Sequence, residues 1–200
     1  MRENLATVSS QSMAFTDSLK TTDPSADKKG IKRKNWRNRI RFLLKSNSSQ
    51  PILHPTKNRS YRPTTDDVKQ WAQSFDQLLS HKYGKAAFRI FLKSEFCEEN
   101  IEFWTACEDF KMLTSHKAMA SKANVIYEEF IKNEAPKEIN LDFHTKNAIA
   151  QNLREPTATS FLAAQRKVYS LMENNAYPRF IDSELYKELL RRAEDSHIKS

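Results

Sequence analysis

Three carboxylates that stand close together in this chain, Glu98, Glu99 and Glu102, are the first candidates for chemistry. Paired carboxylates can serve as general acid and base, or as ligands of a metal ion. Acidic residues are equally favoured in the first turn of a helix, because the unpaired backbone N–H groups there carry partial positive charge. A catalytic pair needs burial to shift its pKa values, and the sequence does not indicate burial at these positions. We therefore favour a structural role for the three acids.

Cysteine, histidine and glycine are too few or wrongly spaced for the common catalytic and metal sites. Cys97, Cys107 and His116 show neither a CxxC nor an HxxxH spacing, and the acidic segments contain no calcium-loop pattern. No GxSxG sequence marks a catalytic serine, and Gly30 and Gly84 alone cannot form a glycine-rich phosphate loop. We expect no metal, no cofactor and no active site, with Cys107 as a buried thiol. A metal-dependent hydrolase is the least favoured alternative.

The 200 residues carry a net charge of +8, and this charge is divided unevenly along the chain. Residues 1–63 hold 14 Lys and Arg against 4 Asp and Glu, a net charge of +10. Residues 64–200 hold 19 against 21, a net charge of −2. The chain thus has a basic N-terminal arm and a nearly neutral body that is long enough to bury its own core. Without an apolar leader or a run of about 20 apolar residues, a soluble intracellular protein is expected.

The basic arm has the pattern of a helix that lies on a membrane surface. Residues 28–45 contain nine Lys and Arg and no acid, and four apolar residues among them recur at helical spacing. A solvated charge run would leave that apolar stripe in water, and a nucleic-acid arm would come with base-stacking aromatics and a known reader fold. We predict an amphipathic helix over about 31–45, followed by a linker over 46–63, that binds anionic lipid and not nucleic acid. Its membrane-binding residues are Trp36, Arg37, Arg39, Ile40, Leu43 and Leu44.

The body shows helical periodicity along its whole length, and it has no alternating strand pattern or hairpin turn. Thr64 and Asp67 have the spacing of a capping box, and Ser183 is placed to cap a last helix. Gly84 and Pro178 are expected to interrupt the helical pattern around them. The sequence predicts an all-α fold of about eight or nine short helices.

One stretch of the body is specific enough to indicate a family. Residues 91–104, with the sequence FLKSEFCEENIEFW, resemble the signature of the regulator of G protein signalling (RGS) box. The resemblance continues, in order and in register, through residues 135–142, 155–157 and 170–180. The large apolar residues of these motifs are expected in the core: Ile101, Phe103, Trp104, Phe110, Phe161 and Phe180.

The resemblance defines the expected domains. Residues 64–190 are predicted to form the RGS domain, a nine-helix bundle, and residues 191–200 a C-terminal tail. The arm over 1–63 resembles the basic amphipathic helix of the small-box subfamily. One member of that subfamily shares the variants Cys97 and Asn174-Asn175, and we expect it to be the nearest relative.

Membership of this family implies a GTPase-activating protein for GTP-bound α subunits of heterotrimeric G proteins, which ends signalling by G-protein-coupled receptors. The catalytic groups would belong to the α subunit, which carries its own arginine and a glutamine that orients the attacking water. The regulator would hold the switch segments of the α subunit in their transition-state geometry. We expect a monomer in the cytoplasm, peripheral on the inner face of the plasma membrane, with a nuclear pool left open. A scaffold that binds signalling proteins without accelerating hydrolysis is the alternative.

The resemblance also implies which residues contact the α subunit. They come from the segment before residue 101, from the segment after Pro136 and from the last motif. Most of the family has Ser, Asp and Lys where this chain has Cys97, Asn175 and Asp182, so one negative charge is lost and one positive charge is reversed. This departure implies a weaker fit to inhibitory-class α subunits and a preference for the q class. The expected contact residues are Glu95, Phe96, Cys97, Glu99, Asn100, Asn140, Leu171, Asn175, Arg179 and Asp182.

Overall fold

A computed structural model describes residues 62–198, with side chains to residue 195. The predicted helix of the arm and residues 46–61 of its linker lie outside the described residues. Between residues 62 and 198 the regular structure consists of α-helical and π-helical segments without a strand, and the expected all-α class is confirmed. The segments are α2 (Thr65–Gln70), α3 (Phe75–Ser80), α4 (Lys82–Ser94), α5 (Glu99–Lys111), α6 (His116–Ile126), η1 (Tyr127–Ile131), α7 (Phe143–Asn152), α8 (Leu162–Leu171), η2 (Met172–Ala176), α9 (Tyr177–Asp182) and α10 (Glu184–Ile198).

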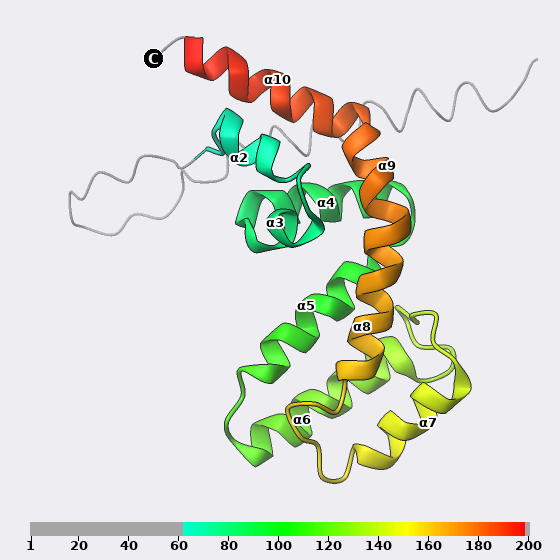
Figure 1. The fold of residues 1–200 in the computed structure, drawn as a ribbon. Coiled ribbons are helices and arrows are strands. Elements are labelled where there is room, and N and C mark those ends of the chain that lie inside the picture. Colours follow the sequence, from blue (N-terminus) through cyan, green and yellow to red (C-terminus); the bar gives the residue numbers. More distant parts are fainter. Residues whose placement is uncertain (1–61, 199–200) are drawn as a thin grey trace, which may run out of the picture.

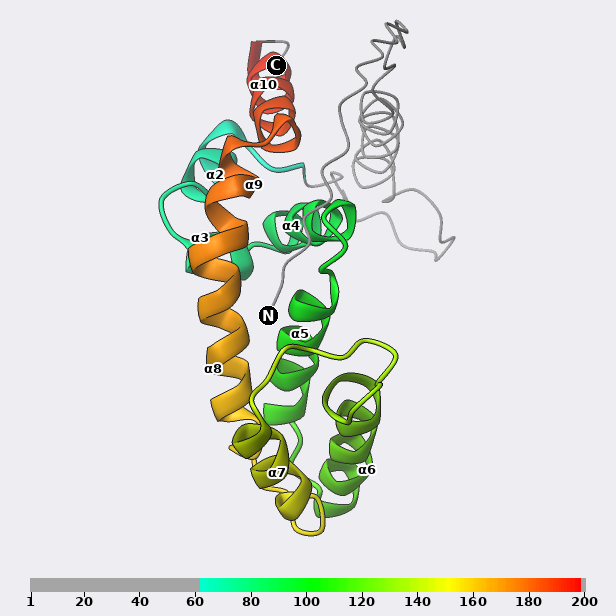
Figure 2. The ribbon, with the colours of Figure 1, turned by 90° about the vertical axis from the view of Figure 1, so that its right-hand side faces the viewer.

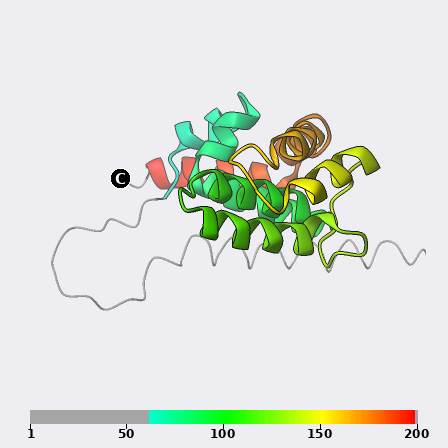
Figure 3. The ribbon, with the colours of Figure 1, turned by 90° about the horizontal axis from the view of Figure 1, so that it is seen from below.

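Two groups of helices lie along one long helix (Figure 1). That helix consists of α8, η2 and α9, which follow one another without a break. α2, α3, α4 and α10 lie at its α9 end, and α5, α6 and α7 gather at its α8 end, which is nearest to the viewer in Figure 3. No helix within residues 62–198 has both the length and the apolar character needed to cross a membrane.

The predicted helix starts are confirmed by cap hydrogen bonds. The Thr64 hydroxyl accepts a hydrogen bond from the Asp67 N–H (3.1 Å), and the Asp67 carboxylate accepts one from the Thr64 N–H (2.8 Å), which completes a capping box. The Ser183 hydroxyl accepts from the Tyr186 N–H (3.2 Å) at the start of α10. These caps satisfy N–H groups that the helix itself cannot pair.

Neither expected helix interruption occurs where it was predicted. Gly84 lies inside α4, and the chain turns instead at His81, whose Nδ1 accepts hydrogen bonds from the N–H groups of Tyr83 (3.2 Å) and Gly84 (3.4 Å). Pro178 lies inside the long helix, as the second residue of α9. The π-helical turn before it, in which the Tyr177 N–H donates to the Met172 carbonyl, widens the helix by one residue and admits the proline, which has no N–H to donate.

The core joins the first and the last helices of the described residues through aromatic side chains. Phe88 contacts the rings of Phe75 (5.3 Å between centroids) and Phe180 (5.5 Å) edge to face. Tyr177 and Tyr186 donate hydrogen bonds from their hydroxyls to backbone carbonyls of the α2 region, at 2.8 and 2.9 Å. Of the six residues expected in the core, five are buried and Trp104 is half-buried against them.

The C-terminal helix extends beyond the expected end of the domain. α10 continues past Leu190 to Ile198, and Ala193 is buried against the core. The first residues of the expected tail therefore continue a packed helix.

Candidate functional site

The loop between α4 and α5 is a tight C-terminal cap with an exposed aromatic side chain at its tip. The Phe96 N–H donates to the Lys93 carbonyl (3.3 Å) and the Cys97 N–H to the Leu92 carbonyl (3.0 Å), which is the Schellman pattern. Phe96 occupies the left-handed position of this cap, with φ of 58°, where glycine is favoured. Its side chain is 81% exposed. A bulky residue that is both strained and exposed points to a contact with another molecule.

The loop is held from behind by a buried amide. The Nδ2 of Asn100, a residue only 7% exposed, donates to the Cys97 carbonyl (3.3 Å) and to Glu99 Oε1 (3.1 Å). Burial raises the pKa of the Glu99 carboxyl, and the neighbouring carboxylates of Glu98 and Glu102 raise it further. Asn100 is thus placed to shape the loop, while Glu95 and Phe96 are exposed and Cys97 and Glu99 are partly exposed.

Asn140 stands in the segment between η1 and α7, on a backbone that is fixed on both sides. Ile139 and Leu141 are buried, whereas Asn140 is exposed. The Ile139 N–H donates to the Phe130 carbonyl (2.9 Å), which ties this segment to η1. Burial of both neighbours leaves the Asn140 side chain available to a partner.

The long helix contributes a third group of exposed residues. Met172, Ala176 and Phe180 are buried at intervals of four, so the preceding residues Leu171, Asn175 and Arg179 form an exposed stripe beside them. Leu171 is 41% exposed, a large fraction for a leucine in a packed helix. Asp182, at the end of α9, is also exposed.

An ion pair brings the long helix and the α4–α5 loop together. Arg179 Nη1 lies 3.4 Å from Glu95 Oε2, and Arg179 Nε donates to the Asn175 carbonyl (3.2 Å). The loop, residues 132–142 and the η2–α9 part of the long helix all lie on the right-hand side of Figure 1, the side that faces the viewer in Figure 2. The fold therefore gathers segments that are more than 80 residues apart into one surface.

Comparison with known proteins identifies the fold. Residues 74–189 match the model of the regulator of G protein signaling domain. The chain belongs to the RGS family. Human Regulator of G-protein signaling 8 is 53% identical over 144 residues, which cover 72% of this chain and 80% of that protein. Rat Regulator of G-protein signaling 18 is 48% identical over 164 residues (80% and 70%), and mouse Regulator of G-protein signaling 5 is 53% identical over 133 residues (66% and 74%).

These matches confirm the RGS family and its small-box subfamily but correct the expected nearest relative. The shared variants Cys97 and Asn174-Asn175 indicated regulator of G protein signalling 2, whereas the relatives found at about half identity are the proteins numbered 8, 18 and 5. The percentage identity is determined by all 133–164 aligned residues, so agreement at three positions has little effect on it. As an RGS protein, the chain is a GTPase-activating protein for G protein α subunits and not itself an enzyme.

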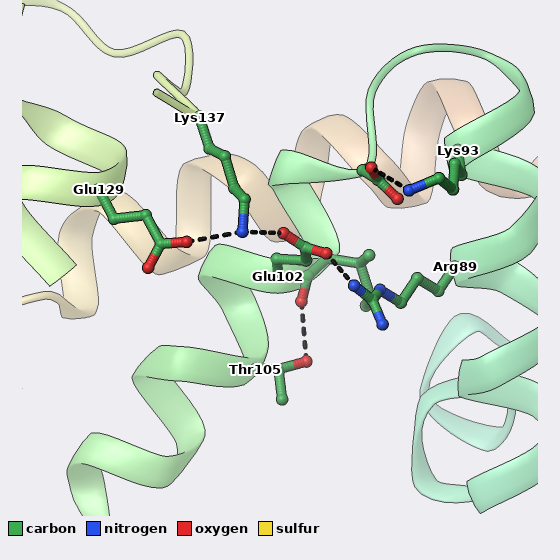
Figure 4. Close-up of polar contacts among 8 residues, drawn as sticks. Arg89, Lys93, Glu102, Thr105, Glu129 and Lys137 are labelled. Carbon is green, nitrogen blue, oxygen red and sulfur yellow. Dashed lines mark hydrogen bonds and ion pairs between the residues drawn. The ribbon is translucent and has the colours of Figure 1, made fainter. Parts of the chain in front are cut away.

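Two of the three clustered acids, Glu98 and Glu102, are part of the scaffold of this RGS domain. Glu102, whose side chain is 13% exposed, pairs with Arg89 of α4 and with Lys137 (2.9 Å), and Lys137 also pairs with Glu129 of η1 at 2.6 Å (Figure 4). Burial alone would raise the pKa of Glu102, but the hydrogen bonds from Lys137 and Arg89 outweigh it and hold the pKa below its usual value. Glu98 pairs with Lys93 (2.7 Å).

These pairs connect both loops of the candidate surface. Glu102 links α5 to α4 on one side and to the segment that carries Asn140 on the other. Lys137 stands in the family motif at residues 135–142, but the sequence did not indicate a role for it. Its partners Glu129 and Glu102 are 8 and 35 residues away, and no local pattern marks them. Cys107 is buried, and burial raises the pKa of its thiol. Within the described residues, no three His, Cys, Asp or Glu side chains gather as a metal site would require.

Proposed function

We propose that this RGS protein accelerates GTP hydrolysis by α subunits of the q class through the surface formed by the α4–α5 loop, residues 132–142 and the η2–α9 helix. The observation that carries the proposal is that three segments with exposed residues lie on the same side of the bundle (Figure 2), and that Arg179 of one segment pairs with Glu95 of another. Their exposed residues offer an aromatic ring, an amide, a carboxylate, a guanidinium and a leucine. Such groups can contact the exposed backbone and side chains of the partner's switch segments.

The surface acts by stabilising a geometry of its partner. An α subunit already holds the arginine and glutamine that the reaction needs. Only contacts that are stronger in the transition state than in the ground state raise the rate. A differential stabilisation of about 2.7 kcal/mol gives a hundredfold acceleration. The ion pairs of Glu102 and Arg179 support this role, because they order the surface before the partner binds.

Replacing Phe96 by glycine should change stability and affinity for the α subunit in opposite directions. Glycine adopts the left-handed cap conformation without strain, so we expect the free energy of unfolding to rise by about 1 kcal/mol in denaturant titrations. Loss of the exposed ring removes a contact, so affinity for an α subunit carrying aluminium fluoride should fall about tenfold in calorimetry. Phe103→Leu, a change in the core, serves as the contrasting control and should lower stability. Unchanged affinity of Phe96→Gly would remove Phe96 from the interface.

The preference for the q class rests on three residues of the surface. Asn175 donates from Nδ2 to the Leu171 carbonyl (3.3 Å), and Arg179 pairs with Glu95. An aspartate at position 175 would bring a carboxylate close to Arg179 and compete with Glu95 for it. Asp182 gives this end of the surface a negative charge where most of the family has a positive one. The surface therefore offers inhibitory-class α subunits a different charge pattern from that of most RGS proteins.

The triple variant Cys97→Ser, Asn175→Asp, Asp182→Lys tests this preference. We expect single-turnover GTP hydrolysis by an inhibitory-class α subunit to be accelerated at least tenfold more by the triple variant than by the native chain, about 1.4 kcal/mol in transition-state binding. Acceleration of a q-class α subunit should not increase. Binding to a panel of α subunits with GDP, or with GDP and aluminium fluoride, completes the test. A native protein that binds both forms equally would be a scaffold and not an accelerator.

The N-terminal arm is proposed to hold the protein in the cytoplasm at the inner face of the plasma membrane. The net charge of +10 on residues 1–63 supports attraction to anionic lipid, and the stripe that includes Trp36 and Ile40 supports insertion. Changing Leu43 and Leu44 together to aspartate should release the protein from vesicles that contain phosphatidylserine, as measured by co-sedimentation. The control pair Ser48→Asp and Ser49→Asp adds the same charge outside the stripe and should leave most of the protein bound. Equal binding of the two double variants would contradict insertion of the stripe.

A further inference from the structure

The segment that carries Asn140 is fastened to the domain by three lysines from different places. Lys137, in the segment itself, pairs with Glu102 and Glu129. Lys167 of α8 pairs with Asp142. Lys146 of α7 reaches back across the segment to Glu138.

Lys146 makes the most enclosed of these contacts. Its Nζ lies 2.5 Å from Glu138 Oε1 and 3.3 Å from Asn133 Oδ1, and its side chain is 17% exposed, against 42% for Lys137 and 51% for Lys167. Exposed ion pairs contribute little, but a partly buried ammonium shared between two acceptors is screened less by solvent. The hydrogen bond from Lys146 also holds the pKa of Glu138 below its usual value.

The same carboxylate fixes the strained turn of the segment. Glu138 Oε2 accepts a hydrogen bond from the Glu134 N–H (2.8 Å), and Glu134 has a φ of 60°, in the left-handed region. Lys146 thus holds two neighbouring residues of the turn, Asn133 directly and Glu134 through Glu138. Without the ammonium, the Glu138 carboxylate would lose its charged partner, and the turn would be free to relax toward an unstrained backbone.

Asn140 stands two residues beyond this clamp. The next fixed point is Asp142, which caps α7 by accepting from the Thr145 N–H (2.9 Å). The backbone of Asn140 is therefore held between Glu138 and Asp142, and Lys146 sets the position of the first of these.

We propose that Lys146 is a positioning residue for the accelerated reaction: it holds Asn133 and Glu138 so that Asn140 meets the α subunit in the productive geometry. The inference rests on the proposed contact role of Asn140.

The test compares Lys146→Gln, Lys146→Arg and Lys117→Gln in the full chain. The substrate is the GTP-bound α subunit, and its concentration is varied to obtain kcat and KM for the accelerated hydrolysis. Lys117 is exposed on α6 and is the matched control for the loss of one lysine charge. We expect Lys146→Gln to lower kcat about fivefold with KM nearly unchanged, a small part of the hundredfold that a displacement of 1 Å can cost. Lys146→Arg should restore the rate, and Lys117→Gln should match the native chain. Amide hydrogen exchange should accelerate in residues 133–142 of Lys146→Gln, while the denaturation midpoint stays near that of the native protein.

A second comparison separates this proposal from the function on which it depends. Because Lys146 acts through Asn140, Lys146→Gln should cause no further loss of kcat in the Asn140→Ala background. If Asn140→Ala is impaired but Lys146→Gln keeps the native kcat, or if the two losses add, the positioning role is wrong and the contact role of Asn140 stands. If Asn140→Ala itself keeps the native kcat, both assignments fail together.

Discussion

Replacing Asn140 by alanine should reduce the acceleration of GTP hydrolysis about 30- to 100-fold, close to the loss from removing one hydrogen-bond group that acts in a transition state. Asn140 is exposed between two buried residues, Ile139 and Leu141, so its amide is accessible to a partner and stands on a backbone that cannot easily move. The side chain has no place in the core, and alanine is compatible with the same backbone. We therefore expect the free energy of unfolding to stay within about 0.5 kcal/mol of the native value.

Single-turnover hydrolysis at saturating regulator provides the measurement. Asn124→Ala is the matched control, because Asn124 is also exposed but bonds to the Ala120 carbonyl within α6 (2.8 Å). The control should accelerate hydrolysis as the native chain does. Binding to the aluminium fluoride form should weaken for Asn140→Ala, while binding to the GDP form stays weak in all three proteins. Full acceleration by a folded Asn140→Ala protein would show that this amide has no part in the reaction.

The second large effect concerns stability. In an exposed helix a glycine-to-alanine change stabilises by about 1 kcal/mol. At Gly84 a Cβ would lie 2.6 Å from the Leu78 carbonyl oxygen and 3.1 Å from the Trp71 ring. The carbonyl belongs to the backbone of α3, so α3 and α4 must move apart to admit one methyl group. We expect Gly84→Ala to lower the free energy of unfolding by about 2 kcal/mol, a typical cost of overpacking.

Urea denaturation followed by tryptophan fluorescence measures this effect, since Trp71 lies at the contact. Lys85→Ala, one residue further along α4, is the control: it removes side-chain atoms and adds none, and should change stability by less than about 0.5 kcal/mol. Acceleration of hydrolysis per folded molecule should be unchanged in both variants, because neither residue belongs to the candidate surface. A Gly84→Ala protein as stable as the native chain would mean that α3 and α4 pack less closely than the structure has them.

Local patterns in the sequence were sufficient for the class of fold, the family and two helix starts. The capping box at Thr64 and the cap at Ser183 could be predicted because a cap is formed by residues three positions apart. Core positions such as Phe103 and Phe161 could be predicted because apolar residues at helical spacing have to be buried. The family signature carried the activity, since its residues stand in one continuous stretch.

Tertiary contacts decided what no local pattern marks. Gly84 was predicted to break a helix, yet it lies inside α4. The position requires glycine because the neighbouring α3 leaves no room for a side chain. Asparagine is usually found on the surface, but Asn100 is buried behind the α4–α5 loop. Glu102 has the spacing of a helix-start acid, but its role comes from Arg89 and Lys137, which reach it from other elements. Local signals act over three or four residues, whereas ion pairs and steric contacts depend on which helices the whole chain brings together.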